Sequence, residues 1–551
     1  MTRIRPTDRL AQLLIPAGLT LLSLGLSLWG ISGSLPYPGN GDEVFNYVLP
    51  AVRIPASGLE PLTMLNPPGY IYAIYLVYGL LHGFGSPVLA SFLKDPGQLI
   101  LEARVISAVA GSLAVTVTYF AARKAFNPRA AAFAGLLAAT AFLPIVYAHL
   151  SLNDAPTLLP VAASLLGAVG VLRNGGYRWY LLAGASAGLA SGVKYTGGFI
   201  IAAMLIAAVL RIREDGLSAV LLRAISAGCA AALAFLAANP YALLDFDRFR
   251  QGIEIQNSAM NSHYKYGETN KHASGYYLWT LTWGLGWVPA IASAAGAVLL
   301  TIRDRRLALV LLLPALALFL SLVTKPLYFS RYLLPAYPIL ILLAAYAANE
   351  AVTKLARGRF AWKVVLGTAA ALLLCGQSLA HVIHFDRVWS RTNTQELAAR
   401  WARANIPAGL PALTDQYLPA WWPATAGNSP NPAEPSDRYP AGLLAGQADP
   451  LLLDKARRAG HCWVIASSYE AGRIAADPAH APRVAAYYAE LHRDATLAFR
   501  ATPFEDSRST NQDIGSNRFS FDFSYNNYPF EYERPGPILS IYRLNNCTTR
   551  D

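Results

Sequence analysis

The chain has 551 residues, of which 54% are hydrophobic and 14% are charged, and its formal net charge is +12. A soluble domain usually carries about 25% charged residues, so this composition excludes an ordinary soluble protein over the whole length. The basic residues gather in short loops between apolar segments. Membrane topology therefore explains the positive charge better than nucleic acid does, and we expect no nucleic-acid partner.

The apolar segments predict a polytopic, all-α membrane domain over residues 1–384. A helix crosses a bilayer with about 20 apolar residues, and about eleven to thirteen segments meet that requirement. The segments are 10–30, 99–122, 130–149, 155–172, 178–193, 196–212, 217–238, 277–302, 307–324, 332–353 and 364–384. A shorter amphipathic segment, 68–82, is expected to lie along the outer interface, and a further span is the alternative.

Charges in the loops predict the orientation, because short loops rich in Lys and Arg stay in the cytoplasm. Such loops contain Arg3, Arg5, Arg9, Arg123, Lys124, Arg129, Arg173, Arg178, Arg211, Arg213, Arg223, Arg303, Arg305, Arg306, Lys354, Arg357, Arg359 and Lys363. The opposite loops hold most of the acidic and aromatic loop residues. We therefore expect a cytoplasmic (inner) membrane protein with a cytoplasmic N-terminus, an uncleaved first span and an extracytoplasmic C-terminal domain.

Residues 385–551 have the composition of a soluble protein and predict a small periplasmic α/β domain. The segment 392–407 is typical of a helix, and 461–466 and 536–544 are typical of strands. Cys462 and Cys547 lie in this domain, and an oxidising compartment permits a disulfide between them. Cys229 and Cys375 lie in apolar segments and are expected to be inert packing residues.

Three carboxylates stand at span ends on the predicted outer face. Asp42 and Glu43 follow the first span, and Asp154 precedes Ala155-Pro156. An ionised carboxylate can accept a proton from a sugar hydroxyl or bind a cation. The alternatives are a solvated loop or helix N-terminal charges for the first two residues and a simple N-cap for Asp154.

Four cations lie on the same face, against the usual distribution of positive charge: Arg104, Lys194, Lys325 and Arg331. A basic residue buried there needs an acidic partner or a phosphate, and Asp42 or Glu43 could pair with Arg104. Snorkelling to the interface is the alternative for Arg104. A base together with phosphate-neutralising cations is what sugar transfer from a lipid phosphate requires.

Two further patterns in the loop 239–276 are less specific. His263 and Tyr264 combine a hydrogen-bonding group with an aromatic ring, as a sugar site does, but an interfacial aromatic belt has the same composition. Asp245 and Asp247 form an Asp-x-Asp pattern, which we interpret as a solvated turn because Arg248 stands beside it.

The order of these motifs resembles the lipid-phosphosugar-dependent membrane glycosyltransferases of the GT-C fold. Within that fold the chain looks like the bacterial family 39/83 group, which includes protein O-mannosyltransferase-like enzymes and the aminoarabinose and galacturonic acid transferases of lipid A and core. The matching motifs are Asp42-Glu43, Asn66-Pro67-Pro68, Glu102-Ala103-Arg104, Asn153-Asp154, Lys194-Tyr195-Thr196-Gly197 and Arg331-Tyr332-Leu333-Leu334-Pro335. The family usually has His where this chain has Asn66, which leaves the role of that position open.

The resemblance implies a polyprenyl-phosphate sugar as donor and a glycan, lipid or protein as acceptor, at the outer surface of the bilayer. It implies that Asp42 is the base of an inverting transfer, and that Glu43 and Asp154 organise the base, the acceptor or a metal. Lys194 and Arg331 would hold the donor phosphate, with Lys325 and Arg104 beside them. Asn66, Asn153 and Tyr195 would contact substrate. No metal ligands are assigned, and a divalent metal ion stays open as a cofactor.

Three other functions remain as alternatives. The chain could be an oligosaccharyltransferase-like GT-C enzyme, a transporter or flippase of lipid-linked sugars, or a scaffold without catalysis. Transport predicts ionisable residues through the membrane midplane and often two similar halves. The apolar segments hold few charges and show no internal repeat, so transport is the less favoured interpretation.

Overall fold

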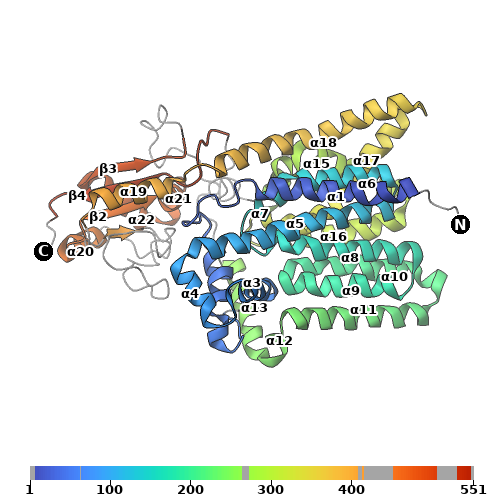
Figure 1. Ribbon diagram of the computed structural model, residues 1–551, viewed down its shortest axis with the longest axis horizontal. Helices are drawn as coiled ribbons and strands as arrows, with labels where there is room; N and C mark the ends of the chain where they lie inside the picture. Colours follow the sequence, from blue (N-terminus) through green and yellow to red (C-terminus); the bar gives the residue numbers. More distant parts are fainter. Residues whose placement is uncertain are drawn as a thin grey trace.

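The computed structural model describes residues 6–62, 64–262, 272–407, 412–414, 451–504 and 530–547. A bundle of long helices runs along the long axis of the molecule, and a small β-sheet with its own helices lies beyond one end of the bundle (Figure 1). The N-terminal end of helix α1 (Pro6–Leu28) lies at the opposite end of the bundle from the sheet (Figure 1). The predicted combination of a helical membrane part with a C-terminal α/β part is confirmed.

Within the described residues, eight helices are long and apolar enough to cross a membrane, or up to ten if two bent helix pairs each count as one span. The eight consist of α5 (Pro96–Ala125), α8 (Asp154–Asn174), η3–α10 (Tyr195–Ile200 and Ile201–Asp215), α11 (Leu217–Ala238), α14–η4–α15 (Ala273–Leu281, Thr282–Gly286 and Trp287–Arg303), α16 (Arg305–Val323), η5–α17 (Ser330–Ala336 and Tyr337–Leu355) and the segment that begins with α18 (Phe360–Trp389). Each predicted span lies on one of these helices, on α1, on α9 (Tyr177–Val193) or on a bent pair. The chain is a multi-pass membrane protein.

One bent pair explains the predicted span 130–149. Helix α6 (Pro128–Thr140) and helix α7 (Phe142–Ala148) meet at Ala141 with a bend of 49°. The backbone of Ala141 is extended, with φ −62° and ψ 126°, so the helical hydrogen-bond ladder stops there. Helix α7 therefore points the following loop, 149–153, toward the predicted site.

The segment 68–82 forms helix α3 (Gly69–His82), a 14-residue helix that is about 21 Å long and too short to cross a core of about 30 Å. An 85° bend separates α3 from α4 (Ser86–Lys94). Both helices lie at the end of the bundle that faces the sheet, as do α12 (Tyr241–Leu244) and α13 (Phe246–Ser262) (Figure 1). The interfacial helix stays a prediction, because α3 and α4 together could also form a broken span or a re-entrant loop.

Small residues allow the central helices to pack closely. A Cβ atom on Gly184 or Gly188 of α9 would collide with the backbone carbonyls of Ala227 or Ala231 of α11. Membrane helices associate through such close backbone contacts because apolar side chains gain little by leaving lipid for protein. Helix α8 lies against α5 and α9, and most of its apolar residues are buried.

The span α14–η4–α15 is broken at Thr282–Gly286, where Gly286 has φ +106°. Side chains of α18 bind the backbone groups that the break releases. Gln377 donates to the carbonyl of Thr282 (2.9 Å) and accepts from the amide of Trp287 (2.8 Å), and Ser378 donates to the carbonyl of Leu285 (2.8 Å). Irregular backbone is tolerated at membrane depth only where protein satisfies it in this way.

The sheet has the strand order β1-β2-β4-β3, with β1 parallel to β2 and the other pairs antiparallel. The strands are β1 (Ala412–Thr414), β2 (Trp463–Ser467), β3 (Ala495–Ala501) and β4 (Leu539–Leu544). The surrounding helices are α19 (Thr394–Asn405), α20 (Leu451–Ala459), α21 (Ser468–Ala476), η6 (Pro478–His480) and α22 (Pro482–Asp494). The predicted helix and both predicted strands are present, at 394–405, 463–467 and 539–544.

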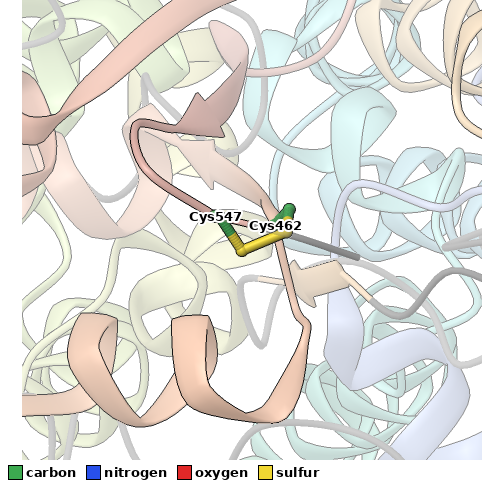
Figure 2. Close-up of a disulfide and its surroundings, with 2 residues drawn as sticks. All are labelled: Cys462 and Cys547. Atoms are coloured by element: carbon green, nitrogen blue, oxygen red, sulfur yellow. A yellow bond between two sulfur atoms is a disulfide. The ribbon is translucent and has the colours of Figure 1, made fainter. Parts of the chain in front are cut away.

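A disulfide joins Cys462 to Cys547, with the Cα atoms 5.5 Å apart (Figure 2). Cys462 precedes β2 and Cys547 follows β4, and these strands pair with Trp463 opposite Arg543. The pairing that the sequence permits is therefore formed, and it fastens the C-terminal strand to the middle of the sheet. Of the other two cysteines, Cys375 is buried and Cys229 is exposed on the bundle surface.

Candidate functional site

Asp42 stands at the start of the short helix η1 (Glu43–Val48). Its Oδ2 accepts a hydrogen bond from Arg331 Nη2 (2.8 Å) and its Oδ1 accepts one from Asn46 (3.0 Å). The Asp42 side chain is 39% exposed, whereas that of Arg331 is 16% exposed. A carboxylate is thus held in one orientation by a largely buried cation and still remains accessible to a hydroxyl from outside.

Asp154 and Lys194 form a second, more buried pair. Asp154 begins α8, Lys194 follows the last residue of α9, and the ammonium binds Asp154 Oδ1. The ammonium also lies 5.2 Å from the centroid of the Tyr332 ring. Burial lowers the pKa of Lys194, and the charge of Asp154 partly opposes that shift.

The two pairs belong to one cluster, because Lys194 and Arg331 both lie over the ring of Tyr332, 5.2 and 5.9 Å from its centroid. The charges of Asp42 and Asp154 act on both cations. Two carboxylates and two cations are balanced in this cluster. A bound phosphodiester would add the negative charge for which two adjacent cations are suited.

Tyr47 adds a phenol to this cluster, and sequence reasoning did not identify it. Burial raises the pKa of Tyr47 well above its usual value, and the charges of Asp154 and Asp42 raise it further. The hydroxyl therefore stays protonated and can donate a hydrogen bond. Tyr47 follows Asp42 by five residues, and the π-helical backbone of Glu43–Val48 makes that spacing about one turn. Sequence periodicity at 3.6 residues per turn gives no such signal.

Glu43 points into the protein, away from the exposed side of Asp42. Arg104 donates to its Oε2 (2.7 Å) and Oε1 (2.8 Å), and to the carbonyls of Ile31 (2.9 Å) and Gly33 (2.7 Å). The amide and hydroxyl of Ser151 also donate to Glu43 Oε2 (2.9 and 3.1 Å). Both ionic side chains are completely buried. The pairing proposed from sequence is present, but this geometry favours a structural role and does not bring Arg104 into the phosphate cluster.

Asn153 and Tyr195 support the Lys194 segment from two sides. Asn153 donates to the carbonyl of Val193 (2.8 Å), which fixes the end of α9 one residue before Lys194. The Tyr195 hydroxyl donates to the carbonyl of Met64 (3.4 Å). Asn153 and Tyr195, which we predicted to contact substrate, therefore donate hydrogen bonds to the protein backbone next to the cluster.

Lys325 and Asn66 lie on other elements. The Lys325 ammonium donates to the side chains of Asn257 and Asn261 of α13, at 3.0 Å each. Asn66 is half-buried in the loop that precedes α3. The structure does not bring Lys325 into the cluster around Asp42, although the sequence places it six residues before Arg331.

The predicted residues His263 and Tyr264 lie outside the residues that the structure describes. Asp245 accepts from the amide of Arg248 (3.1 Å), so it begins α13 as a turn residue, as predicted. Among the described residues, no group of three His, Cys, Asp or Glu side chains is arranged to hold a metal ion. A metal cofactor stays open.

Comparisons with known proteins agree with the predicted resemblance. Residues 88–242 match the family model described as dolichyl-phosphate-mannose-protein mannosyltransferase. The archaeal oligosaccharyltransferase AglB from Archaeoglobus fulgidus, in complex with an inhibitory peptide and a dolichol-phosphate, matches with a TM-score of 0.58 and 13% identity. That match covers 98% of this chain and 89% of AglB.

ArnT from Cupriavidus metallidurans in the apo state matches with a TM-score of 0.50 and 17% identity, over 82% of this chain and 93% of ArnT. None of the curated protein sequences compared with the chain matches it. At these identities the likeness concerns the fold, and the roles of individual residues rest on the geometry described above.

Proposed function

We propose that this chain, whose fold is that of the GT-C glycosyltransferases, transfers a sugar from a polyprenyl-phosphate donor to an acceptor at the outer face of the cytoplasmic membrane. One observation carries the proposal. An accessible carboxylate, Asp42, lies in the same cluster as two cations, Arg331 and Lys194, that can receive a phosphate.

In the proposed reaction, Asp42 accepts the proton of an acceptor hydroxyl while that oxygen attacks the anomeric carbon of the donor sugar. The bond between the anomeric carbon and the phosphate oxygen breaks, and its electron pair leaves with polyprenyl phosphate. Arg331 and Lys194 stabilise the charge that develops on this oxygen. A single displacement from the face opposite the phosphate inverts the anomeric carbon.

The remaining site residues divide into two proposed groups. Tyr47 keeps a protonated hydroxyl that can donate to a bound substrate, and Asp154 holds Lys194 in place until the phosphate arrives. Glu43 and Arg104 fasten the segment that carries Asp42, because their charges already satisfy each other inside the protein. A base and a phosphate site must be held within a fraction of an ångström for such a transfer, so the buried pair contributes indirectly.

We also propose the orientation. The disulfide between Cys462 and Cys547 supports an oxidising compartment for residues 385–551, and hence a periplasmic domain. The basic loops then face the cytoplasm together with the N-terminus, as the positive-inside rule requires. Residues 1–384 form the catalytic membrane domain in this arrangement.

An oligosaccharyltransferase-like reaction is the second candidate. The fold of AglB extends over 98% of this chain, including the C-terminal part, and AglB was solved with a dolichol-phosphate and a peptide. The two candidates share the lipid phosphate and differ in the glycan and the acceptor. A transporter of lipid-linked sugars would bind the donor without cleaving it.

The test uses the purified full-length protein in lipid nanodiscs with a panel of polyprenyl-phosphate and polyprenyl-diphosphate sugars. Release of the lipid phosphate or diphosphate is measured with and without acceptor extracts. We expect turnover to fall by about 10²–10⁴-fold in Asp42→Asn, as for loss of a general base. Asp454→Asn is the matched control, because Asp454 forms an exposed ion pair with Arg457 in the soluble part.

Three outcomes separate the candidates. Turnover of donors that carry a single sugar supports the proposed function, and turnover of lipid-linked oligosaccharides alone, onto a peptide acceptor, supports the oligosaccharyltransferase-like candidate. Release that continues unchanged in Asp42→Asn removes that residue from the role of base. If the protein binds donor lipids but releases lipid phosphate or diphosphate from none of them, with any acceptor, the result would contradict both enzymatic candidates.

A further inference from the structure

The last turn of α18 contacts the segment that leads to Asp42. A Cβ atom on Gly33 would collide with the backbone carbonyl and indole of Trp389, and one on Gly30 would come within 2.6 Å of Ser390 Oγ. The Trp389 ring also lies 5.6 Å from the guanidinium carbon of Arg104. The Gly30–Gly33 segment, which leads to Asp42, therefore packs directly against the end of α18.

The same turn holds a buried ionisable pair that the proposed reaction does not use. His149 Nε2 lies 3.3 Å from Asp386 Oδ1, and both side chains are completely buried. His149 Nε2 also lies 3.1 Å from the carbonyl of Trp29, and Nδ1 lies 2.9 Å from the carbonyl of Ile145.

Both ring nitrogens thus face oxygen atoms. Carbonyls and an ionised carboxylate only accept hydrogen bonds. The two carbonyl contacts are satisfied together only when both ring nitrogens of His149 carry a proton, because each carbonyl accepts one hydrogen bond. An ionised Asp386 beside that ring makes the pair neutral overall, which lowers the cost of burying it in the membrane part.

His149 begins the segment 149–154, which consists of the loop 149–153 and the first residue of α8, and this segment touches both halves of the site. Ser151 donates twice to Glu43, which neighbours Asp42 in the chain. Asp154 pairs with Lys194. The segment 149–154 therefore lies between the segment that carries the base and the residue that receives the phosphate, and His149 is the point at which it is attached to α18.

We propose that His149 and Asp386 are positioning residues for the transfer reaction. The pair anchors the segment 149–154 on the last turn of α18, the turn on which the Gly30–Gly33 segment also rests, and so fixes the separation between Asp42 and Lys194. This inference rests on the proposed function. Because α18 continues toward α19 of the C-terminal part, the same anchor connects that part to the site.

The test compares His149→Ala, Asp386→Ala and Asp386→Asn in the nanodisc assay. Misplacement of reacting groups by about 1 Å costs up to about 100-fold in rate, so we expect kcat to fall by about 10- to 100-fold. The KM for the donor should stay within about threefold, because the cations themselves are unchanged. Asp386→Asn keeps the shape and one acceptor oxygen, and it should recover part of the loss that Asp386→Ala causes.

Double variants distinguish positioning from a general loss of stability. His149→Ala combined with Ser151→Ala should lose less than the product of the two single losses, because both act through one loop. Ser293→Ala is the matched control: its hydroxyl is buried in another part of the bundle and lies within hydrogen-bond distance of the carbonyls of Pro289 (2.7 Å) and Leu340 (2.8 Å), to either of which it can donate. The loss of kcat in the double variant of Ser293→Ala and His149→Ala should equal the product of the two single losses.

Amide hydrogen exchange gives a readout that does not need turnover. In His149→Ala, exchange should rise in peptides covering 149–154 and 192–196, and it should stay unchanged in β2 and β4. Unchanged exchange in the loop overturns the inference even if no donor is turned over, and unchanged kcat overturns it if the wild-type protein is active. Wild-type inactivity with the expected exchange pattern contradicts the proposed function but not the anchoring of the loop.

Discussion

Replacing Arg104 by Met tests whether this residue fastens the protein or binds the donor. Met keeps much of the side-chain volume and removes the four hydrogen bonds that Arg104 donates. Glu43 then stays buried with only the two bonds from Ser151, and the carbonyls of Ile31 and Gly33 lose a donor. Removal of one partner of a buried ion pair costs about 3–5 kcal/mol. With an unfolding entropy of about 2.1 cal/mol/K per residue, this corresponds to a fall of about 3–4 °C in the apparent midpoint.

The assay is a thermal unfolding scan of the protein in nanodiscs at one fixed scan rate, because membrane proteins of this size often unfold irreversibly. Glu43→Gln should also lower the midpoint. The double variant should lose less than the sum of the two single variants, since neither charge is then left alone. The reasoning is refuted if Arg104→Met leaves the midpoint unchanged and raises the KM for the donor, because that result would place Arg104 at the donor phosphate.

Three further predictions concern other parts of the chain. Burial lowers the pKa of Lys194, so its charge is present below that pKa and is lost as the pH rises. The alkaline decline of kcat/KM should therefore begin at a pH below the ordinary lysine pKa of about 10.4. Lys194→Arg should move this decline to higher pH. Replacing Cys462 and Cys547 by Ser should destabilise the C-terminal part by about 2–4 kcal/mol, measured by amide exchange of β4 with and without reductant. Gly33→Ala should lower kcat by displacing the segment before Asp42, and a normal rate would show that the segment adapts.

Much of the site could be predicted because span ends are visible in the sequence. Asp42, Asp154, Lys194 and Arg331 each stand at the boundary of an apolar segment, and loop charges place all four on one face. The structure brings these four residues together. Lys325 also stands at the end of an apolar segment, so the sequence did not distinguish it from Lys194 and Arg331. The position of α13 shows that Lys325 instead binds two asparagine side chains of that helix.

The remaining features depend on packing between distant segments. His149 and Asp386 are separated by more than 200 residues, and each has an unremarkable local sequence at the end of an apolar segment. Tyr47 approaches the cluster because the backbone at Glu43–Val48 is π-helical, which no periodic pattern in the sequence reveals. The direction of Glu43, into the protein rather than toward substrate, follows from the position of Arg104 on α5.

The broken span α14–η4–α15 has a consequence for biosynthesis. The backbone groups of Thr282 and Trp287 are satisfied by Gln377, which lies about 90 residues later in the chain. During synthesis this span reaches the membrane before α18 exists, so lipid alone cannot accommodate the break at that stage. The segment must either remain a continuous helix or stay near water until α18 inserts. We therefore expect the bundle to mature from an early, straighter form, with α18 as the last helix to complete it.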